Sequence, residues 1–193
     1  MGPSKPAFRA IIGVSGASGS VYGWRLLEKL RAQGGVETHL VMTRSGERTA
    51  FLEMGKTAAD FRALADCHYP VEDIGCRLAS GSSAMDAMVI APCSIHTMSA
   101  IAAGISSNLM IRAADVMLKE RRKLILMVRE SPLHLGHLRS MTALAEMGAM
   151  IAPPVPAFYH QPASVADLVE HSVDRVMDLM GRPAEGARRW GEK

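Results

Sequence analysis

Apolar positions along the chain fall into two kinds of segment, which alternate from one end to the other. Short, often β-branched apolar runs are typical of buried strands, and they occur at residues 9–14, 38–42, 87–91, 124–128 and 149–152. Apolar residues spaced three and four apart predict amphipathic helices, at residues 21–33, 46–53, 94–103, 108–121, 135–147 and 165–180. The polar segment 55–73 is expected to be irregular, and the prolines of 153–162 to enforce an extended loop.

This alternation predicts a three-layer α/β fold, a parallel sheet with helices on both of its faces. The 193 residues suit a single domain with a sizeable core. We expect that core over about residues 9–181, followed by a polar tail over 182–193. Because ligands of parallel sheets bind beyond the carboxyl ends of the strands, the segments that directly follow the strands are the candidate binding segments.

Composition sets limits on the kind of protein. The chain is 48% apolar and 21% charged with a net charge of +3, and its basic clusters at 119–123 and 182–189 are typical of solvated helix ends rather than of a nucleic-acid surface. Three cysteines without C-x-x-C spacing argue against a disulfide framework and favour a reducing compartment, the cytoplasm. There is no recognisable signal peptide and no apolar run long enough for a membrane span.

The loop after the first predicted strand is rich in glycine and reads G-V-S-G-A-S-G over residues 13–19. Glycines allow close backbone approach to a ligand, the helix that follows offers N–H groups to a phosphate, and Ser15 and Ser18 add hydroxyls. The spacing differs from the dinucleotide pattern, and Thr43, not an acidic residue, follows the second strand. A mononucleotide site is therefore favoured over a dinucleotide site, with a plain glycine turn as the alternative.

Two further strand ends carry polar side chains. Ser94 stands at a predicted helix start with Thr97 one turn on, which suits either simple capping or phosphate binding. Arg129 and Glu130 follow the 124–128 strand, where the first could hold a phosphate and the second could act as general acid or base, or the two could form a loop ion pair.

The predicted helix at 108–121 carries Arg112, Asp115 and Lys119 on one face. This face is either a salt-bridged stripe facing solvent or a cationic surface for a second anion. His134 and His137, at the start of the predicted helix over 135–147, lack the additional ligands that a metal site needs, so we expect no metal.

Several motifs, in the same order along the chain, together resemble the flavin prenyltransferase (UbiX) family. They are S-G-A-S-G at 15–19, S-G-S-S at 80–83, P-C-S at 92–94, R-A-A-D-V-M-L-K at 112–119, K-E-R-R at 119–122, R-E at 129–130, the proline-rich 153–162 and R-W at 189–190. Each motif alone is weak, but their shared order over nearly the whole chain makes the resemblance specific.

The resemblance implies a Rossmann-like or flavodoxin-like flavoprotein domain assembled into a dodecamer. It implies transfer of a dimethylallyl group from dimethylallyl phosphate, or the diphosphate in some members, to reduced FMN, with bonds formed at flavin N5 and then C6. The product, prenylated FMN, is the cofactor of UbiD-type decarboxylases. No metal, nucleic acid or membrane takes part.

The resemblance also assigns roles residue by residue. It assigns FMN contacts to Gly16, Ala17, Ser18, Thr43, Ser94, Ile95, His96, Thr97 and Arg129. It assigns prenyl-phosphate contacts to Arg112, Lys119, Tyr159 and Arg175, and proton handling to Ser18, Glu53 and Glu130. Thr43 replaces a serine of many members and keeps the hydroxyl, whereas His96 occupies a variable position and is expected to bind through its backbone alone.

Two alternatives stay open at this point. Flavin-dependent cysteine decarboxylases share the flavin-binding fold, but they typically carry a P-A-S-A-N-T-like motif where residues 92–97 here read P-C-S-I-H-T. A non-catalytic flavin carrier, or an accessory subunit of a decarboxylase, would need neither the carboxylates nor the prenyl-phosphate residues.

Overall fold

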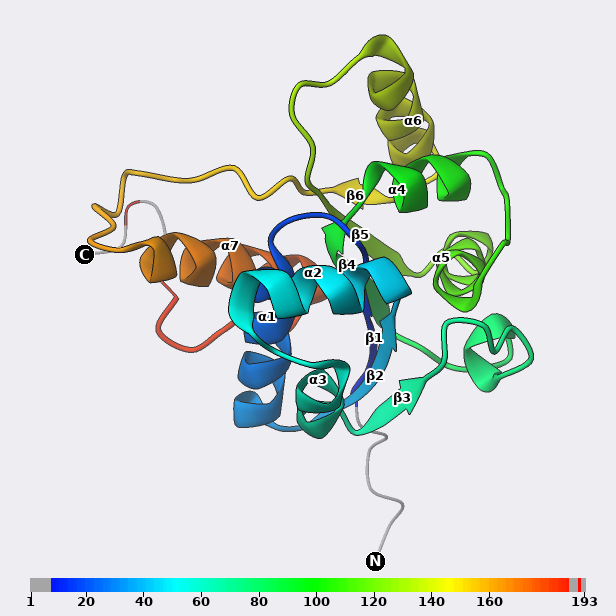
Figure 1. The fold of residues 1–193 in the computed structure, drawn as a ribbon, viewed down its shortest axis with the longest axis horizontal. Coiled ribbons are helices and arrows are strands. Elements are labelled where there is room, and N and C mark those ends of the chain that lie inside the picture. Colours follow the sequence, from blue (N-terminus) through cyan, green and yellow to red (C-terminus); the bar gives the residue numbers. More distant parts are fainter. Residues whose placement is uncertain (1–7, 188–190, 192–193) are drawn as a thin grey trace, which may run out of the picture.

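The computed structural model describes residues 8–187 and 191, and its centre is a six-stranded sheet in the order β3-β2-β1-β4-β5-β6 (Figure 1). The strands are β1 (Phe8–Val14), β2 (Val36–Met42), β3 (Cys67–Tyr69), β4 (Ala87–Cys93), β5 (Lys123–Val128) and β6 (Met150–Ile151). All neighbouring strands pair in parallel. This strand order is that of the Rossmann fold, so the predicted three-layer α/β architecture is confirmed. The R-W motif at 189–190 lies outside the described residues.

Helices cover both faces of the sheet (Figure 1). They are α1 (Ser20–Gln33), α2 (Arg44–Met54), α3 (Ala58–Leu64), α4 (Ile95–Ala102), α5 (Leu109–Lys119), α6 (Leu135–Glu146) and α7 (Val165–Met180), with a short 3₁₀ helix at Arg77–Ala79. One buried cluster joins α1 and α7 to the sheet, and a second joins α4, α5 and α6 to its other face. Within the described part of the chain, no helix is long and apolar enough to cross a membrane.

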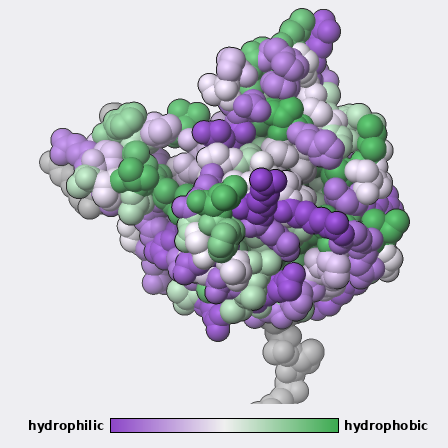
Figure 2. Space-filling view, viewed as in Figure 1, coloured by the Kyte–Doolittle hydropathy of each residue, from purple (hydrophilic) through white to green (hydrophobic). Residues whose placement is uncertain are grey.

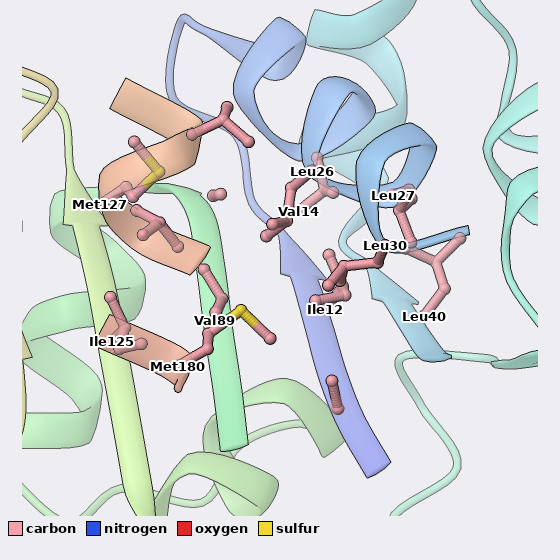
Figure 3. Packing of buried hydrophobic residues seen from close by; sticks show 14 of the residues in the cluster. Ile12, Val14, Leu26, Leu27, Leu30, Leu40, Val89, Ile125, Met127 and Met180 are labelled. Atoms are coloured by element: carbon pink, nitrogen blue, oxygen red, sulfur yellow. The ribbon is translucent and has the colours of Figure 1, made fainter. Parts of the chain in front are cut away.

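The first cluster shows how the sequence pattern becomes a core. Leu26, Leu27 and Leu30 of α1 project from one helical face onto the sheet, where they are at most 1% exposed (Figure 3). Gly23 brings α1 especially close, because a Cβ at this position would collide with the carbonyl oxygen of Ala91 in β4. The start of α1 is thereby held against the ends of β1 and β4.

The topology changes direction between β1 and β4. From β1 the chain builds outward to β2 and β3, and from β4 it builds outward to β5 and β6. Loops leaving the carboxyl ends of these two central strands therefore diverge, which opens the crevice where such sheets bind ligands.

Two sequence predictions were wrong. The segment 55–73 is not irregular throughout, because it contains α3 and the edge strand β3. The strand expected over 87–91 does not end before Pro92: β4 continues to Cys93, with a shift in register between Ile90 and Cys93 where the proline stands. Proline is tolerated at such an irregularity because the ladder is interrupted there.

Charged side chains join α1 to α7 at the surface. Arg25 donates to both carboxylate oxygens of Glu170 at 2.7 Å, and Lys29 contacts both Glu170 at 3.2 Å and Asp174. The hydrogen bond from Arg25 is the main reason that the pKa of Glu170 is lowered to about 2.

Replacing Arg25 by Met should lower the free energy of unfolding by about 1 kcal/mol at pH 7, a modest value because the Arg25 and Glu170 side chains are 39% and 36% exposed. The pKa of Glu170 is lower in the folded state than its ordinary value of 4.5, so this contribution is lost as the pH falls from there toward 2. Urea unfolding at pH 7 and pH 3 should show the smaller difference at pH 3. The exposed Arg48→Met on α2 is the control, and an equal difference at both pH values would contradict the assignment.

Candidate functional site at the carboxyl ends of the strands

Ser15 ties together the loops that leave β1 and β4. Its buried hydroxyl donates to the carbonyl of Pro92 at 2.9 Å and accepts from the backbone N–H of Ser94 at 2.7 Å. The Ser15 N–H also donates to Pro92. The Ser15 hydroxyl is therefore engaged in hydrogen bonds with the protein itself. Ser15 fixes the two loops relative to each other, and we expect the neighbouring residues to make the ligand contacts.

The glycine loop packs against the start of α2. Gly16 touches Ser45 so closely that a Cβ on Gly16 would overlap the Ser45 side chain, and Gly46 meets the Val14 carbonyl in the same way. Thr43 caps α2 by accepting from the Gly46 N–H at 3.0 Å, and its own N–H donates to Val14. The loop after β2 therefore forms a second wall beside Gly16, Ala17 and Ser18.

Glu53, at the other end of α2, closes the glycine loop from outside. Its carboxylate accepts from the N–H of Gly19 at 3.0 and 3.1 Å and from the N–H of Ser20 at 3.0 Å. Burial opposes the charge of Glu53, but hydrogen bonds from the Ser18 side chain and these N–H groups outweigh it and lower the pKa. The N–H groups of Gly19 and Ser20 at the start of α1 thus bind a carboxylate of the protein itself, where the sequence pattern suggested a phosphate.

The loop after β4 leads directly into residues 94–97, at the start of α4. Ser94 caps α4 by accepting from the N–H of Thr97 at 3.3 Å, and its hydroxyl donates to the Thr97 hydroxyl at 3.1 Å. Thr97 is buried, Ile95 is half-buried and His96 is exposed. Cys93 is fully buried and burial raises its thiol pKa far above the ordinary value, so it packs as a small apolar residue at the end of β4.

Arg129 and Glu130 directly follow β5, beside the end of β4. The N–H of Arg129 donates to the carbonyl of Cys93 at 3.1 Å, and Glu130 accepts from the N–H of Ser131 at 2.9 Å. Burial raises the pKa of Tyr22 on α1, and the positive charge of Arg129 partly offsets this, so the guanidinium lies near the start of α1. Both Arg129 and Glu130 are exposed.

Arg112 and Lys119 lie together on α5 beside the 79–83 segment. Arg112 donates to the carbonyl of Ala79 at 3.3 Å and pairs with Asp115 at 2.6 Å, while Lys119 pairs with Glu120. The Lys119 ammonium is 2.6 Å from where a Cβ on Gly81 would stand. Both predictions for this face therefore have support: the ion pair is present, and a cationic group adjoins the S-G-S-S segment.

Tyr159 and Arg175 lie elsewhere, on and beside α7. The Tyr159 hydroxyl contacts His171 Nε2 at 2.6 Å, and Arg175, 66% exposed, is 3.8 Å from Asp178. Helix α7 packs on the α1 side of the sheet and α5 on the other side (Figure 1). One chain therefore brings together the residues expected to contact FMN but leaves the four residues expected to contact the prenyl phosphate in two groups on opposite faces.

Among the described residues, one group of three side chains has the geometry for a metal ion: Glu37, His39 and Cys67, near the amino end of β2. Its carboxylate already meets Arg9 at 3.4 Å, His39 at 3.0 Å and Arg77 at 3.9 Å. Two arginines compete with any cation for this carboxylate, and the group lies away from the strand ends that form the candidate site.

Some contacts within the site could not be predicted from the sequence alone. Ser45 and Gly46 form the wall beside Gly16, and the only sequence signal was Thr43 standing as a potential cap before a helix. The role of Glu53 was inferred from the family resemblance alone, because nothing in the sequence pattern indicates that its carboxylate contacts Gly19.

Comparisons with known proteins agree with this arrangement, in which helix starts and hydroxyls gather where the sheet topology changes direction. The family described as Flavoprotein matches residues 3–177. A flavin prenyltransferase UbiX of Thauera aromatica is 50% identical over 182 residues, covering 94% of this chain and 93% of the relative. These matches define the class of protein as flavoprotein.

Two solved structures are similar over nearly their entire length. A dodecameric FMN-dependent Ubix-like decarboxylase from Escherichia coli O157:H7 has a TM-score of 0.94 and 45% identity, covering 96% of this chain and 100% of that one. AnUbiX (PadA1), in complex with FMN and dimethylallyl pyrophosphate, has a TM-score of 0.94 and 41% identity, covering 96% and 98%. The chain belongs to the flavin prenyltransferase (UbiX) family.

Proposed function

We propose that the protein transfers a dimethylallyl group from dimethylallyl phosphate to reduced FMN and so makes prenylated FMN. The observation that carries this proposal is the 50% identity with a flavin prenyltransferase over 94% of the chain. The site geometry supports it, because the residues expected to hold FMN form one continuous wall around the β1–β4 crevice. In this proposal the chain is a single flavoprotein domain.

The residues of the crevice fit a flavin mononucleotide. The start of α4 and the loop at Gly16 and Ala17 present backbone N–H groups, Ser18 and Thr43 present hydroxyls, and Arg129 presents a guanidinium near α1. The close Gly16–Ser45 contact leaves no room for a side chain on Gly16, which keeps the loop backbone open to the ligand. When bound, reduced FMN supplies the nucleophilic ring atoms that accept the prenyl group.

The remaining residues then have defined tasks. Arg112, Lys119, Tyr159 and Arg175 stabilise the charge of the departing phosphate. Ring closure requires loss of a proton, for which Glu130 is the acceptor, with Ser18 and Glu53 ordering the glycine loop and relaying protons. No metal is assigned a task, so activity should survive treatment with EDTA.

Neighbouring copies of the chain complete the site in this proposal. The α5 and α7 groups lie on opposite faces of one sheet, so a phosphate can meet both only if they come from different copies. Apolar side chains are exposed on α2 (Phe51 and Leu52), in the segment before α7 (Val155 and Phe158) and at the start of α7 (Val165). Figure 2 shows hydrophobic surface on the part of the molecule at the left, where Figure 1 places α7. Such surfaces are typical of subunit contacts. We propose a dodecamer, as in the Escherichia coli relative.

The product would pass to a UbiD-type decarboxylase, and we place both in the cytoplasm. Cys67, Cys76 and Cys93 are free thiols, which agrees with a reducing compartment.

The proposed function is tested by anaerobic incubation with reduced FMN and dimethylallyl phosphate, followed by mass spectrometry of the flavin. We expect the flavin mass to increase by one dimethylallyl group. An unchanged mass in folded, FMN-loaded protein would favour a flavin carrier instead.

Replacing Lys119 by Ala should weaken dimethylallyl phosphate binding by about tenfold or more, because a charge-assisted contact to the phosphate is lost. FMN affinity should not change, because Lys119 lies on α5, away from the FMN wall. Calorimetric titration of each ligand measures the two effects. Arg121→Asn removes an equal charge nearby, and asparagine tolerates the left-handed backbone of Arg121 (φ 54°). Equal loss in both variants would show a general field effect instead of a specific contact.

A further inference from the structure

Tyr159 is held against α7 by two histidines. Its hydroxyl oxygen is 2.6 Å from Nε2 of His171. The His160 ring stacks on the His171 ring with centroids 4.6 Å apart and planes 10° apart, and Tyr159 meets the two rings edge-on at 5.5 and 5.4 Å. The Tyr159 hydroxyl is therefore hydrogen-bonded to His171, a residue with no role in the proposed function so far.

The presence or absence of a hydrogen on Nε2 of His171 decides where the phenolic hydrogen of Tyr159 points. When Nε2 is unprotonated it can only accept, so Tyr159 must donate its one hydrogen to His171. When Nε2 carries a hydrogen, as it does in the imidazolium and in one of the two neutral tautomers, it donates to the Tyr159 oxygen, and the phenolic hydrogen becomes available to a third group. A phosphate oxygen cannot donate a hydrogen when it is ionised, so Tyr159 can bind it well only in the second arrangement.

The surroundings favour the neutral form of His171. Burial lowers its pKa, and the neighbouring His160 and Arg175 act in the same direction, while Asp174 acts against them. His160 belongs to the segment before α7, whereas Asp174 and Arg175 belong to α7 itself. A phosphate placed beside Tyr159 and Arg175 would neutralise the positive field and favour the charged imidazole.

We propose that His171 is a positioning residue that switches the Tyr159 hydroxyl between donation to His171 and donation to the prenyl phosphate. Binding of the phosphate is then accompanied by uptake of one solvent proton at His171. This inference rests on the proposed function, in which Tyr159 is a phosphate ligand.

The first test is the pH dependence of dimethylallyl phosphate affinity in the FMN-loaded protein. Ionisation of the phosphate itself, with its second pKa near 6, affects every variant equally. His171→Gln keeps a hydrogen-bonding side chain that does not titrate. We expect wild-type affinity to weaken about tenfold more than that of His171→Gln between pH 6 and pH 8.

The second test counts protons directly. Calorimetry in two buffers of different ionisation enthalpy should show more proton uptake per phosphate bound at pH 7.5 in wild type than in His171→Gln. His68→Gln, at an exposed histidine of β3, should behave as wild type. In the Tyr159→Phe background, His171→Gln should have no further effect, because the group through which His171 acts is gone.

The outcomes separate the inference from the proposed function. Binding with the same pH dependence and the same proton uptake in wild type and His171→Gln overturns the role of His171 and leaves the prenyltransferase intact. Absence of dimethylallyl phosphate binding by wild type overturns the proposed function, and this inference with it. Melting temperatures of the variants show whether any loss reflects misfolding.

Discussion

Replacing Glu53 by Gln should reduce flavin prenylation by about a hundredfold or more and weaken FMN binding by about tenfold. The Glu53 carboxylate accepts hydrogen bonds from the N–H groups of Gly19 and Ser20 at 3.0–3.1 Å and from the Ser18 side chain. An amide offers a single oxygen and turns its NH2 group toward these donors. The glycine loop would then lose its outer support, and Ser18 would lose its hydrogen-bond acceptor.

Two measurements check the Glu53 prediction: FMN titration by fluorescence, and single-turnover prenylation by mass spectrometry. Glu47→Gln is the matched control, because Glu47 is on the same helix but its carboxylate faces Arg62 at 3.5 Å. Normal FMN affinity in Glu53→Gln would show that the glycine loop keeps its shape without the carboxylate.

The same hydrogen bonds define the pH range of this support. They lower the pKa of Glu53 below its ordinary value of 4.5, so the carboxylate stays ionised at and somewhat below that pH. The support is present above this range and is lost only when the pH falls through the folded-state pKa. A carboxylate stabilised in this way is also a weak base, which favours Glu130 over Glu53 as the acceptor of the ring proton.

Local pattern was sufficient for the central strands and most helices, because their signals are concentrated in a few consecutive residues. The same is true of Ser94 and Thr43, which cap helices as residue type and position indicate. Helix α3 was missed although Thr57 and Asp60 form a capping box at its start. Edge strand β3 was missed because three residues of mixed polarity carry no alternation.

Contacts that join distant segments could not be predicted from pattern. The Ser15 hydroxyl meets Pro92 and Ser94 across two strands, and Gly23 touches Ala91, only because β1 and β4 became neighbours in the sheet. The separation of Arg112 from Arg175 has the same origin, because the face that each helix covers follows from its crossover and not from its own residues.

Replacing Glu130 by Gln should leave FMN affinity unchanged and reduce turnover by about a hundred- to ten-thousandfold, the range for loss of a general base. Unlike Glu53, Glu130 supports no part of the glycine loop. Its contact within the described chain is with the neighbouring N–H of Ser131 at 2.9 Å, a bond that the amide oxygen of glutamine can also accept. The shape of the loop should therefore survive the substitution, while the group that takes up the proton is lost.

The contrast between the two carboxylates makes the Glu130 prediction specific. Glu53→Gln should impair both FMN binding and turnover, whereas Glu130→Gln should impair turnover alone, with dimethylallyl phosphate affinity also retained. Chromatography and absorption spectra of quenched single turnovers check this, because the singly attached and the ring-closed prenyl flavins are isomers of equal mass. The singly attached form should accumulate only if proton loss follows the first bond. Ring closure at the wild-type rate in Glu130→Gln would remove this residue from proton transfer and return that task to Ser18 and Glu53, whose hydrogen bond already joins them.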